Sequence, residues 1–177
     1  MEGDGPNVLP AELAKFAGLA AKGDDESFAA LCGLLKTPLF RTAKGILGDE
    51  ALALDAVSEA VLRGYKGIKR LREPKYAATW FTRILINAAK DISKRQKREV
   101  ALDMAPEKEY YDDYGNLEFE ALIASLPHKL REIVSLKYYS EFTLEEISLI
   151  LKIPAGTVKS RLNRALGQLR WEMACER

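Results

Sequence analysis

The stretch that decides the fold is residues 143–162, TLEEISLILKIPAGTVKSRL. Thr143, followed three residues later by Glu146, has the pattern of a capping box, which predicts the start of a helix. Residues 152–156 contain a proline and a glycine, so they predict a tight turn. From Thr157 onward, apolar residues recur at helical spacing and predict a second helix. Two short helices joined by such a turn describe a helix-turn-helix.

The second helix of this motif has a small and basic outward face. Its apolar side is predicted to comprise Val158, Leu162, Ala165, Leu166 and Leu169. The outward residues are Ser160, Arg164, Gly167 and Trp171, flanked by Lys159, Arg161 and Asn163. Arginine and lysine donate to guanine edges and phosphates, and small residues let a helix backbone approach the major groove. This pattern predicts a helix that reads duplex DNA. The alternative is a solvated basic face on an ordinary helical bundle.

Composition limits the class of protein. The chain has 177 residues, of which 47% are hydrophobic and 30% charged, enough for one packed domain or two small ones. The net charge of +1 means that nucleic-acid binding must rest on local basic patches. No apolar run approaches the roughly 20 residues that cross a bilayer. Residues 1–10 lack the basic and hydrophobic parts of a secretory signal. We therefore expect a cytoplasmic protein without direct membrane insertion.

Cysteine and histidine usage predicts no metal site and no cofactor. Cys32 and Cys175 show no metal-ligand spacing and fit a reducing compartment, with Cys32 expected inside and Cys175 outside. His128 follows Pro127 at an expected helix start and is interpreted as a surface residue. No phosphate loop and no nucleophile–base pair is visible, and the acidic residues do not cluster on structured elements as a magnesium-dependent nuclease would need. The chain is therefore not expected to be an enzyme.

Nearly every segment has helical periodicity, which predicts an all-α fold. Helices are expected over 11–22, 26–46, 51–65, 77–98, 117–126 and 128–139, with Pro38 bending or splitting the second. Their apolar stripes are Phe28, Leu31, Leu35, Leu39 and Ala43 in the second helix, Leu54, Val57, Val61 and Tyr65 in the third, and Phe81, Ile84, Leu85, Ala88 and Ile92 in the fourth. Residues 1–10 are expected to be disordered.

Residues 99–116 are rich in acids and show no helical stripe. Because a structureless loop of that length is uncommon inside a compact domain, we interpret it as a flexible acidic linker. The predicted fold is therefore two small helical domains, 11–98 and 117–174, joined by this linker, with the helix-turn-helix in the second.

The run 153–165, IPAGTVKSRLNRA, closely resembles the helix that reads the promoter −35 element in bacterial extracytoplasmic-function sigma factors. A helix-turn-helix alone would not separate these proteins from response regulators, but the N-terminal half does. Residues 22–28 and 46–65 resemble the helices with which sigma factors clasp RNA polymerase, and residues 79–91 resemble their −10 melting and reading segment. The family often has glutamine at the position of Ser58 and an aromatic residue at Val61.

The resemblance implies a protein that binds core RNA polymerase, directs it to promoters and helps to open the duplex. Three sets of site residues follow from it. The core-polymerase set is Asp55, Ser58, Glu59, Leu62 and Tyr65. The set for the melted −10 element is Arg72, Lys75, Trp80, Arg83, Asn87, Lys90 and Lys94, in which Asn87 would recognise a base. The set for the duplex −35 element is Thr157, Lys159, Ser160, Arg161, Asn163 and Arg164.

The resemblance also implies an anti-sigma factor as partner, commonly a membrane-anchored one that covers the polymerase-binding surface. The linker would pass through the active-site cleft of the polymerase. Trp80 could either pack internally or catch an unstacked base, whereas Phe81 on the apolar stripe is expected in the core. Two alternatives stay open: a helix-turn-helix regulator that does not join polymerase, and a bundle that binds only proteins.

Overall fold

The structure is a computed structural model that describes residues 10–102 and 117–175, with side chains described for 10–98 and 121–174. Its elements are α1 (Pro10–Ala21), α2 (Asp25–Leu47), α3 (Glu50–Gly67), the short 3-10 helices η1 (Ile68–Arg70) and η2 (Pro74–Tyr76), α4 (Ala77–Leu102), α5 (Leu117–Ser125), α6 (His128–Tyr138), α7 (Leu144–Leu151) and α8 (Ala155–Cys175). Within these ranges there is no strand, and the predicted all-α fold is confirmed.

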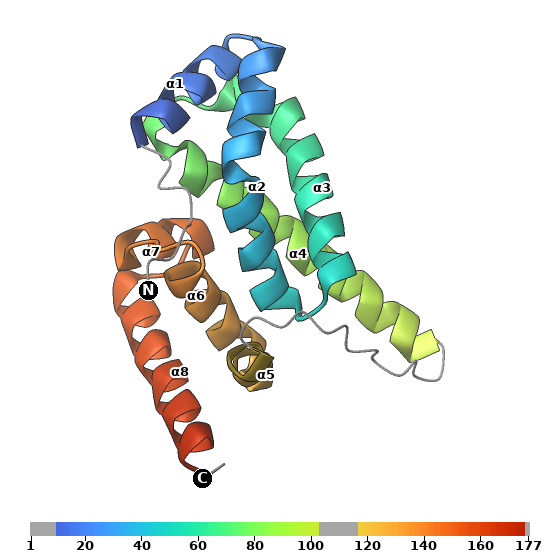
Figure 1. Ribbon diagram of the computed structural model, residues 1–177, viewed down its shortest axis with the longest axis vertical. Helices are drawn as coiled ribbons and strands as arrows, with labels where there is room; N and C mark the ends of the chain where they lie inside the picture. The colour runs from blue at the N-terminus through green and yellow to red at the C-terminus, as the bar shows by residue number, and fades with distance from the viewer. Residues whose placement is uncertain (1–9, 103–116, 176–177) are drawn as a thin grey trace.

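Helices α1–α4 form an N-terminal unit, and α5–α8 form a C-terminal unit beside it (Figure 1). Pro10 opens α1, one residue before the expected start. Helix α4 continues to Leu102, so the first four residues assigned to the linker extend this helix. The remaining linker positions, 103–116, and the N-terminal positions 1–9 lie outside the described residues.

Helix α2 runs continuously through Pro38, so the proline does not split it. Leu35 and Leu39, on either side of the proline, are both buried and hold the two halves against the same core. All five residues of the apolar stripe predicted for this helix are buried. The helix ends at Gly48, which has the left-handed conformation (φ 68°) that favours glycine. Asp49 then caps α3 by accepting a hydrogen bond from the amide of Leu52 at 2.8 Å.

The face that α3 buries differs from the predicted apolar stripe. Leu54 and Tyr65 are 53% and 52% exposed, whereas the buried residues are Ala53, Ala56, Ala60 and Gly64. The reason is close packing against α2 and α4: a Cβ on Gly64 would lie 2.6 Å from Cζ of Phe81, which is fully buried. Small residues admit the neighbouring helices, and Leu54, Leu62 and Tyr65 lie on the exposed side of α3.

In the C-terminal unit, the helix-turn-helix forms as predicted. Thr143 Oγ1 accepts from the amide of Glu146 at 3.2 Å, and Glu146 Oε2 accepts from the amide of Thr143 at 2.8 Å, which completes the capping box. Lys152 ends α7 in the left-handed conformation (φ 55°). Helix α8 begins at Ala155, two residues earlier than expected, because the carbonyl of Pro154 already accepts the amides of Thr157 and Val158.

The C-terminal unit buries its own apolar cluster, which consists of Ile123, Leu126, Leu130, Val134, Ala165 and Leu169. A second set of its residues belongs to the core of the N-terminal unit instead: Ile133, Leu136, Phe142, Ile147, Ile150 and Val158. The two units therefore share one continuous apolar core in this structure. No helix in the described part of the chain is long and apolar enough to cross a lipid bilayer.

Candidate nucleic-acid interface

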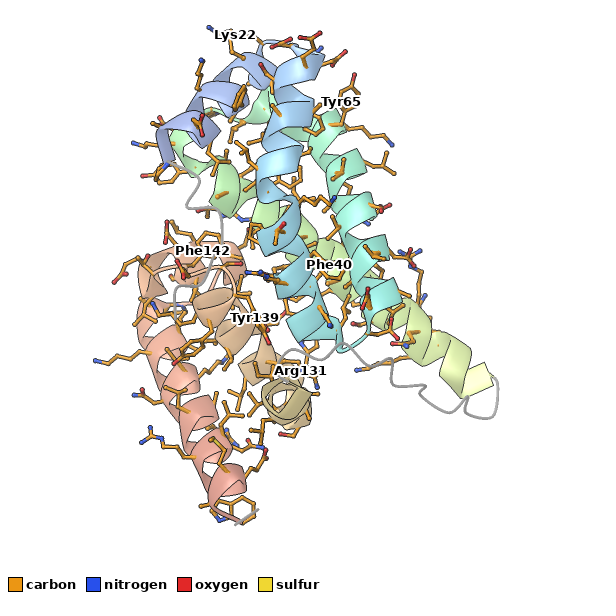
Figure 2. All side chains as sticks on the ribbon, viewed as in Figure 1. Lys22, Phe40, Tyr65, Arg131, Tyr139 and Phe142 are labelled. Atoms are coloured by element: carbon orange, nitrogen blue, oxygen red, sulfur yellow. The ribbon has the colours of Figure 1, made fainter. Side chains whose placement is uncertain are left out.

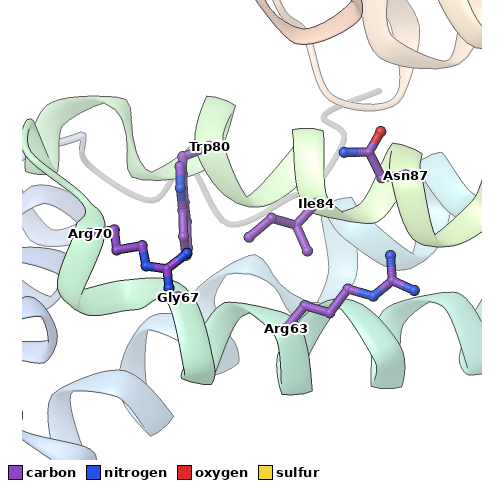
Figure 3. A pocket seen from close by; sticks show the side chains of 6 residues that line it. All are labelled: Arg63, Gly67, Arg70, Trp80, Ile84 and Asn87. Carbon is purple, nitrogen blue, oxygen red and sulfur yellow. The ribbon is translucent and has the colours of Figure 1, made fainter.

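A pocket of about 240 Å³ lies between α3 and α4. Its lining residues are Arg63, Gly67, Arg70, Trp80, Ile84 and Asn87 (Figure 3). Trp80 and Arg70 lie toward one end, and Arg63 and Asn87 lie toward the other (Figure 3). The Trp80 ring packs edge-on against Phe81, with ring centroids 5.6 Å apart. The pocket thus combines an aromatic ring, an amide and two guanidinium groups.

Arg63 is fixed by two carboxylates. Its Nε donates to Glu59 at 2.7 Å, and its Nη1 donates to Asp91 of α4 at 2.9 Å. These hydrogen bonds, first that of Glu59 and then that of Asp91, raise the pKa of Arg63 above its ordinary value, so the group stays charged. Neither Arg63 nor Arg70 was among the residues predicted for the −10 element. The four-residue spacing of Glu59 and Arg63 was the available signal for the first of them.

The residues predicted for the −10 element do not all meet at this pocket. Trp80 and Asn87 line it. Arg72 and Lys75 lie on the exposed segment around η2, where Lys75 Nζ stands 3.5 Å from Glu73 Oε2 and 5.0 Å from the ring centroid of Tyr76. Lys94 lies exposed further along α4.

Arg83 and Lys90 lie on α4 beside Asn87 but are engaged by the C-terminal unit. Arg83 Nη2 donates to the carbonyl of Leu149 at 2.8 Å. Lys90 Nζ lies 3.1 Å from Glu132 Oε1. The basic stripe predicted on α4 is therefore divided: Asn87 and Lys94 face solvent, and Arg83 and Lys90 are half-buried.

The outward side of α3 carries an apolar strip, defined here as Leu54, Leu62 and Tyr65. Leu62, at 58% exposure, is the most open of the three, and Asp55 and Ser58 are exposed beside it. Tyr65 packs its ring edge-on against Phe28, and its hydroxyl donates to Asp25 at 3.0 Å. Of the residues predicted to contact polymerase, Glu59 alone is occupied by an ion pair, the one with Arg63.

Helix α8 presents the basic face predicted for the −35 element. Lys159, Ser160, Asn163 and Arg164 are exposed, whereas Thr157 and Arg161 are half-buried. Ser160 Oγ donates back to the carbonyl of Thr157 at 3.1 Å, which keeps that side chain close to the helix. The α8 face is thus open for a duplex to approach.

Comparison with known proteins places both units in one class. Residues 34–99 match the family model for Sigma-70 region 2, and residues 116–169 match that for Sigma-70 region 4. Taken with the helix-turn-helix and the basic faces, these matches define a sigma-70-type protein that has both promoter-binding regions.

Individual relatives show which family within this class the chain resembles. An RNA polymerase sigma-E factor of Streptomyces coelicolor is 30% identical over 140 residues, covering 76% of this chain and 79% of the relative. The ECF RNA polymerase sigma factor SigW of Bacillus subtilis is 29% identical over 171 residues, covering 86% and 91%. The chain belongs to the extracytoplasmic-function family of RNA polymerase sigma factors. It is therefore a transcription initiation factor that directs RNA polymerase to promoters, and the resemblance found in the sequence is confirmed.

Solved structures share the fold. CnrH in complex with the cytosolic domain of CnrY aligns with a TM-score of 0.74 at 18% identity, covering 94% of this chain and 99% of that one. The sigma factor RpoE in complex with the anti-sigma factor NepR, from Bartonella quintana, aligns with a TM-score of 0.68 at 24% identity, covering 81% and 95%.

Proposed function

We propose that three surfaces of this chain divide the work of promoter recognition. The apolar strip of α3 binds core polymerase, the pocket between α3 and α4 captures an unstacked base of the −10 element, and the outward face of α8 reads the −35 element. The observation that carries the proposal is the placement of Trp80, Asn87 and two arginines around one pocket.

The chemistry of this pocket suits a single nucleobase. Aromatic side chains bind unstacked bases by stacking, whatever the base. The Asn87 amide offers a donor and an acceptor to a base edge, and Arg70 supplies positive charge for the adjoining phosphates. Arg63 is already paired with Glu59 and Asp91, so it shapes the pocket wall. A volume of about 240 Å³ is smaller than the roughly 300–1,000 Å³ of drug-sized ligand sites. It therefore favours one ring over a larger ligand.

The exposed apolar strip of α3 supports a protein contact. Exposed apolar side chains that gather on one face of a helix are typical of protein–protein interaction sites. Leu62→Asp is expected to abolish co-purification with core RNA polymerase, because it places a charge at the centre of that contact. Leu19→Asp, at an exposed position of α1, is the matched control and should leave binding unchanged. If the Leu62→Asp variant still binds core enzyme, α3 is not part of the interface.

Measuring promoter opening tests whether the pocket captures an unstacked base. Run-off transcription from genomic fragments with core enzyme identifies a promoter, and permanganate footprinting then reports its melted bases. Trp80→Ala and Asn87→Ala should each reduce melting while core binding persists, and Trp80→Phe should retain most of it because an aromatic face remains. Full melting with both alanine variants would contradict capture of a base in this pocket.

The family supports an expectation about partners and location. The two solved structures contain the cytosolic domain of CnrY and the anti-sigma factor NepR as partners, and we expect a comparable anti-sigma partner that covers the α3 strip. The chain is expected to act where polymerase acts, in the cytoplasm, and to contribute by binding and not by catalysis, without a cofactor. A regulator that does not join polymerase would bind promoter duplexes but fail the core-enzyme experiment.

A further inference from the structure

The two arginines of the pocket between α3 and α4 differ in their charge environment. Arg63 donates to Glu59 at 2.7 Å and to Asp91 at 2.9 Å. Arg70, at the other end of the pocket, is exposed and forms no ion pair with a residue that the structure describes (Figure 3). A cation between two carboxylates attracts a phosphate less than an unpaired cation does. We therefore expect the phosphate of a nucleotide in this pocket beside Arg70, and its base beside Arg63.

Arg63 presents only hydrogen-bond donors to the pocket. Its guanidinium lines the pocket, whereas the carboxylates of Glu59 and Asp91 do not. A guanidinium has five N–H donors and no acceptor. Glu59 takes the donor on Nε and Asp91 takes one on Nη1, and Nη2 donates to no residue in the described ranges. Donors therefore remain for a base, without an acceptor beside them on this side chain.

The donors of Arg63 are held in a fixed direction. Glu59 lies one turn before Arg63 on α3, and Asp91 lies on α4, so two helices hold the guanidinium. Because the planar guanidinium is pre-organised, it loses little freedom for each hydrogen bond that it forms. Toward the other end of the pocket, a Cβ added to Gly67 would lie 3.3 Å from Cζ2 of Trp80, so this ring is closely packed as well. A base stacked on Trp80 would therefore meet donors in a defined place.

Asn87 does not impose the same chemical requirement on a base. Its amide has donors and an acceptor, and it can meet an amino group or a carbonyl oxygen by turning over. Asn87 is exposed and lies toward the same end of the pocket as Arg63 (Figure 3). Of these two side chains, only Arg63 can therefore reject a base because that base presents a donor.

We infer that Arg63 is a specificity-determining residue, which selects a base with a carbonyl oxygen over adenine at the captured position. Guanine, cytosine and thymine each have a carbonyl oxygen, whereas adenine presents an amino group instead. An amino group that faces the donors of Arg63 leaves both groups without a partner, which weakens binding. Asp91 is then a positioning residue that acts through Arg63. The inference rests on the proposed function, in which the pocket captures a base of the −10 element.

The first experiment locates the captured base, using holoenzyme assembled from the full chain and core RNA polymerase. A promoter found by run-off transcription is made as a fluorescein-labelled duplex with an unpaired −10 element. An abasic site replaces each −10 nucleotide in turn. At the captured position, the losses of affinity from the abasic site and from Trp80→Ala should not add, because both remove the same contact. If no position is coupled to Trp80, the proposed function and this inference are both overturned.

The second experiment compares adenine with hypoxanthine at that position. These purines have the same size and carry an amino group or a carbonyl oxygen at the same carbon. Wild-type holoenzyme should bind the hypoxanthine promoter about fivefold or more tightly than the adenine promoter. Arg63→Gln should reduce this preference to about twofold or less, because a glutamine amide can also accept from an amino group.

Arg41→Gln is the matched control for the same change of charge. Arg41 is exposed on α2, it follows Phe40, which is labelled in Figure 2, and it does not line the pocket. This variant should keep the wild-type preference for hypoxanthine. Equal binding of both promoters by the wild type, or an unchanged preference in Arg63→Gln, would overturn the inference and leave capture of a base intact.

Two variants of Asp91 test its positioning role, and they decide the question if circular dichroism shows that Arg63→Gln does not fold. Asp91→Asn keeps an oxygen that can accept from Nη1 of Arg63 and should retain the preference for hypoxanthine. Asp91→Ala removes that hydrogen bond and should lower the preference about twofold or more. If Asp91→Ala weakens binding of both promoters equally, Asp91 supports only the fold, and the selection by Arg63 is overturned with it.

Salt dependence tests the orientation of the nucleotide. Arg70→Gln should lower the slope of log affinity against log salt by about 0.7, the value for one phosphate contact on a single strand. The preference for hypoxanthine should persist in this variant. Arg63→Gln should change the slope less, because Glu59 and Asp91 already pair with this cation. A larger change of slope for Arg63→Gln than for Arg70→Gln would place the phosphate beside Arg63 and overturn the inference.

Discussion

The substitution Gly64→Ala tests whether the close packing of α3 against Phe81 requires a glycine. An alanine in a helix interior ordinarily stabilises it by about 1 kcal/mol relative to glycine. Here the added Cβ would lie 2.6 Å from Cζ of Phe81 and 3.1 Å from Cε2. The ring is 0% exposed and packs between Phe28 and Trp80, so it has little room to move. Overpacking of a core costs about 1–3 kcal/mol.

The matched control is Gly33→Ala in α2, where a Cβ meets no atom within 4 Å. The helix-propensity gain is common to both variants and cancels in their difference. Gly64→Ala should therefore unfold at a free energy about 1–3 kcal/mol below that of Gly33→Ala. Phe81→Leu, added to Gly64→Ala, should recover part of this loss because the collision is removed.

Urea unfolding of the full chain, followed by tryptophan fluorescence, measures the difference. A Trp171→Phe background leaves Trp80 as the reporter, and Trp80 contacts Phe81 directly. Equal slopes against urea are required for the midpoints to be compared as free energies. If Gly64→Ala is as stable as Gly33→Ala, the ring yields to the new methyl group, and the small-residue explanation of the α3 face is wrong.

Four further outcomes are expected. Thr143→Ala removes the capping box of α7 and should cost about 1 kcal/mol in urea unfolding; an unchanged midpoint would deny the cap a role in stability. Arg164→Ala should weaken holoenzyme binding to a −35 duplex by about 1–3 kcal/mol if this side chain pairs with guanine, as a binding titration would show. Burial lowers the pKa of His128 from its ordinary 6.5, so the unfolded chain binds the proton more readily. Stability is then complete above the unfolded pKa and falls as the pH drops through it; His128→Gln should flatten that acid side in a pH series of urea midpoints. Burial raises the pKa of Cys32 to about 11, so in a Cys175→Ser chain a disulfide reagent at mildly alkaline pH should react on the order of 100-fold more slowly with folded than with urea-unfolded protein.

Local sequence patterns predicted the features that depend only on neighbouring residues in the sequence. The capping box of Thr143 and Glu146 fixed the start of α7, and the stripe of α2 named its buried residues correctly. The buried face of helix α3 could not be predicted in this way. Apolar periodicity locates large residues, but at Gly64 the decisive quantity is the space left by Phe81, which comes from a different helix.

The candidate site shows the same limit. The resemblance pointed to Trp80 and Asn87, and both line the pocket. It did not reveal that Arg63 is held in place by Asp91, 28 residues along the chain. Nor could it foresee that Arg83 and Lys90 contact α7 and α6, because contacts between the units depend on how two separately patterned surfaces fit together.

Mutations on the two sides of α3 should change different measured quantities. Substitutions on the side of Ala53, Ala56, Ala60 and Gly64 should lower the amount of folded protein in a cell, whatever the promoter. Substitutions at Leu62 should leave abundance intact and reduce reporter output alone. A deep mutational scan that scores both quantities should therefore divide one helix into two interleaved sets of positions, one constrained by folding and the other by the partner.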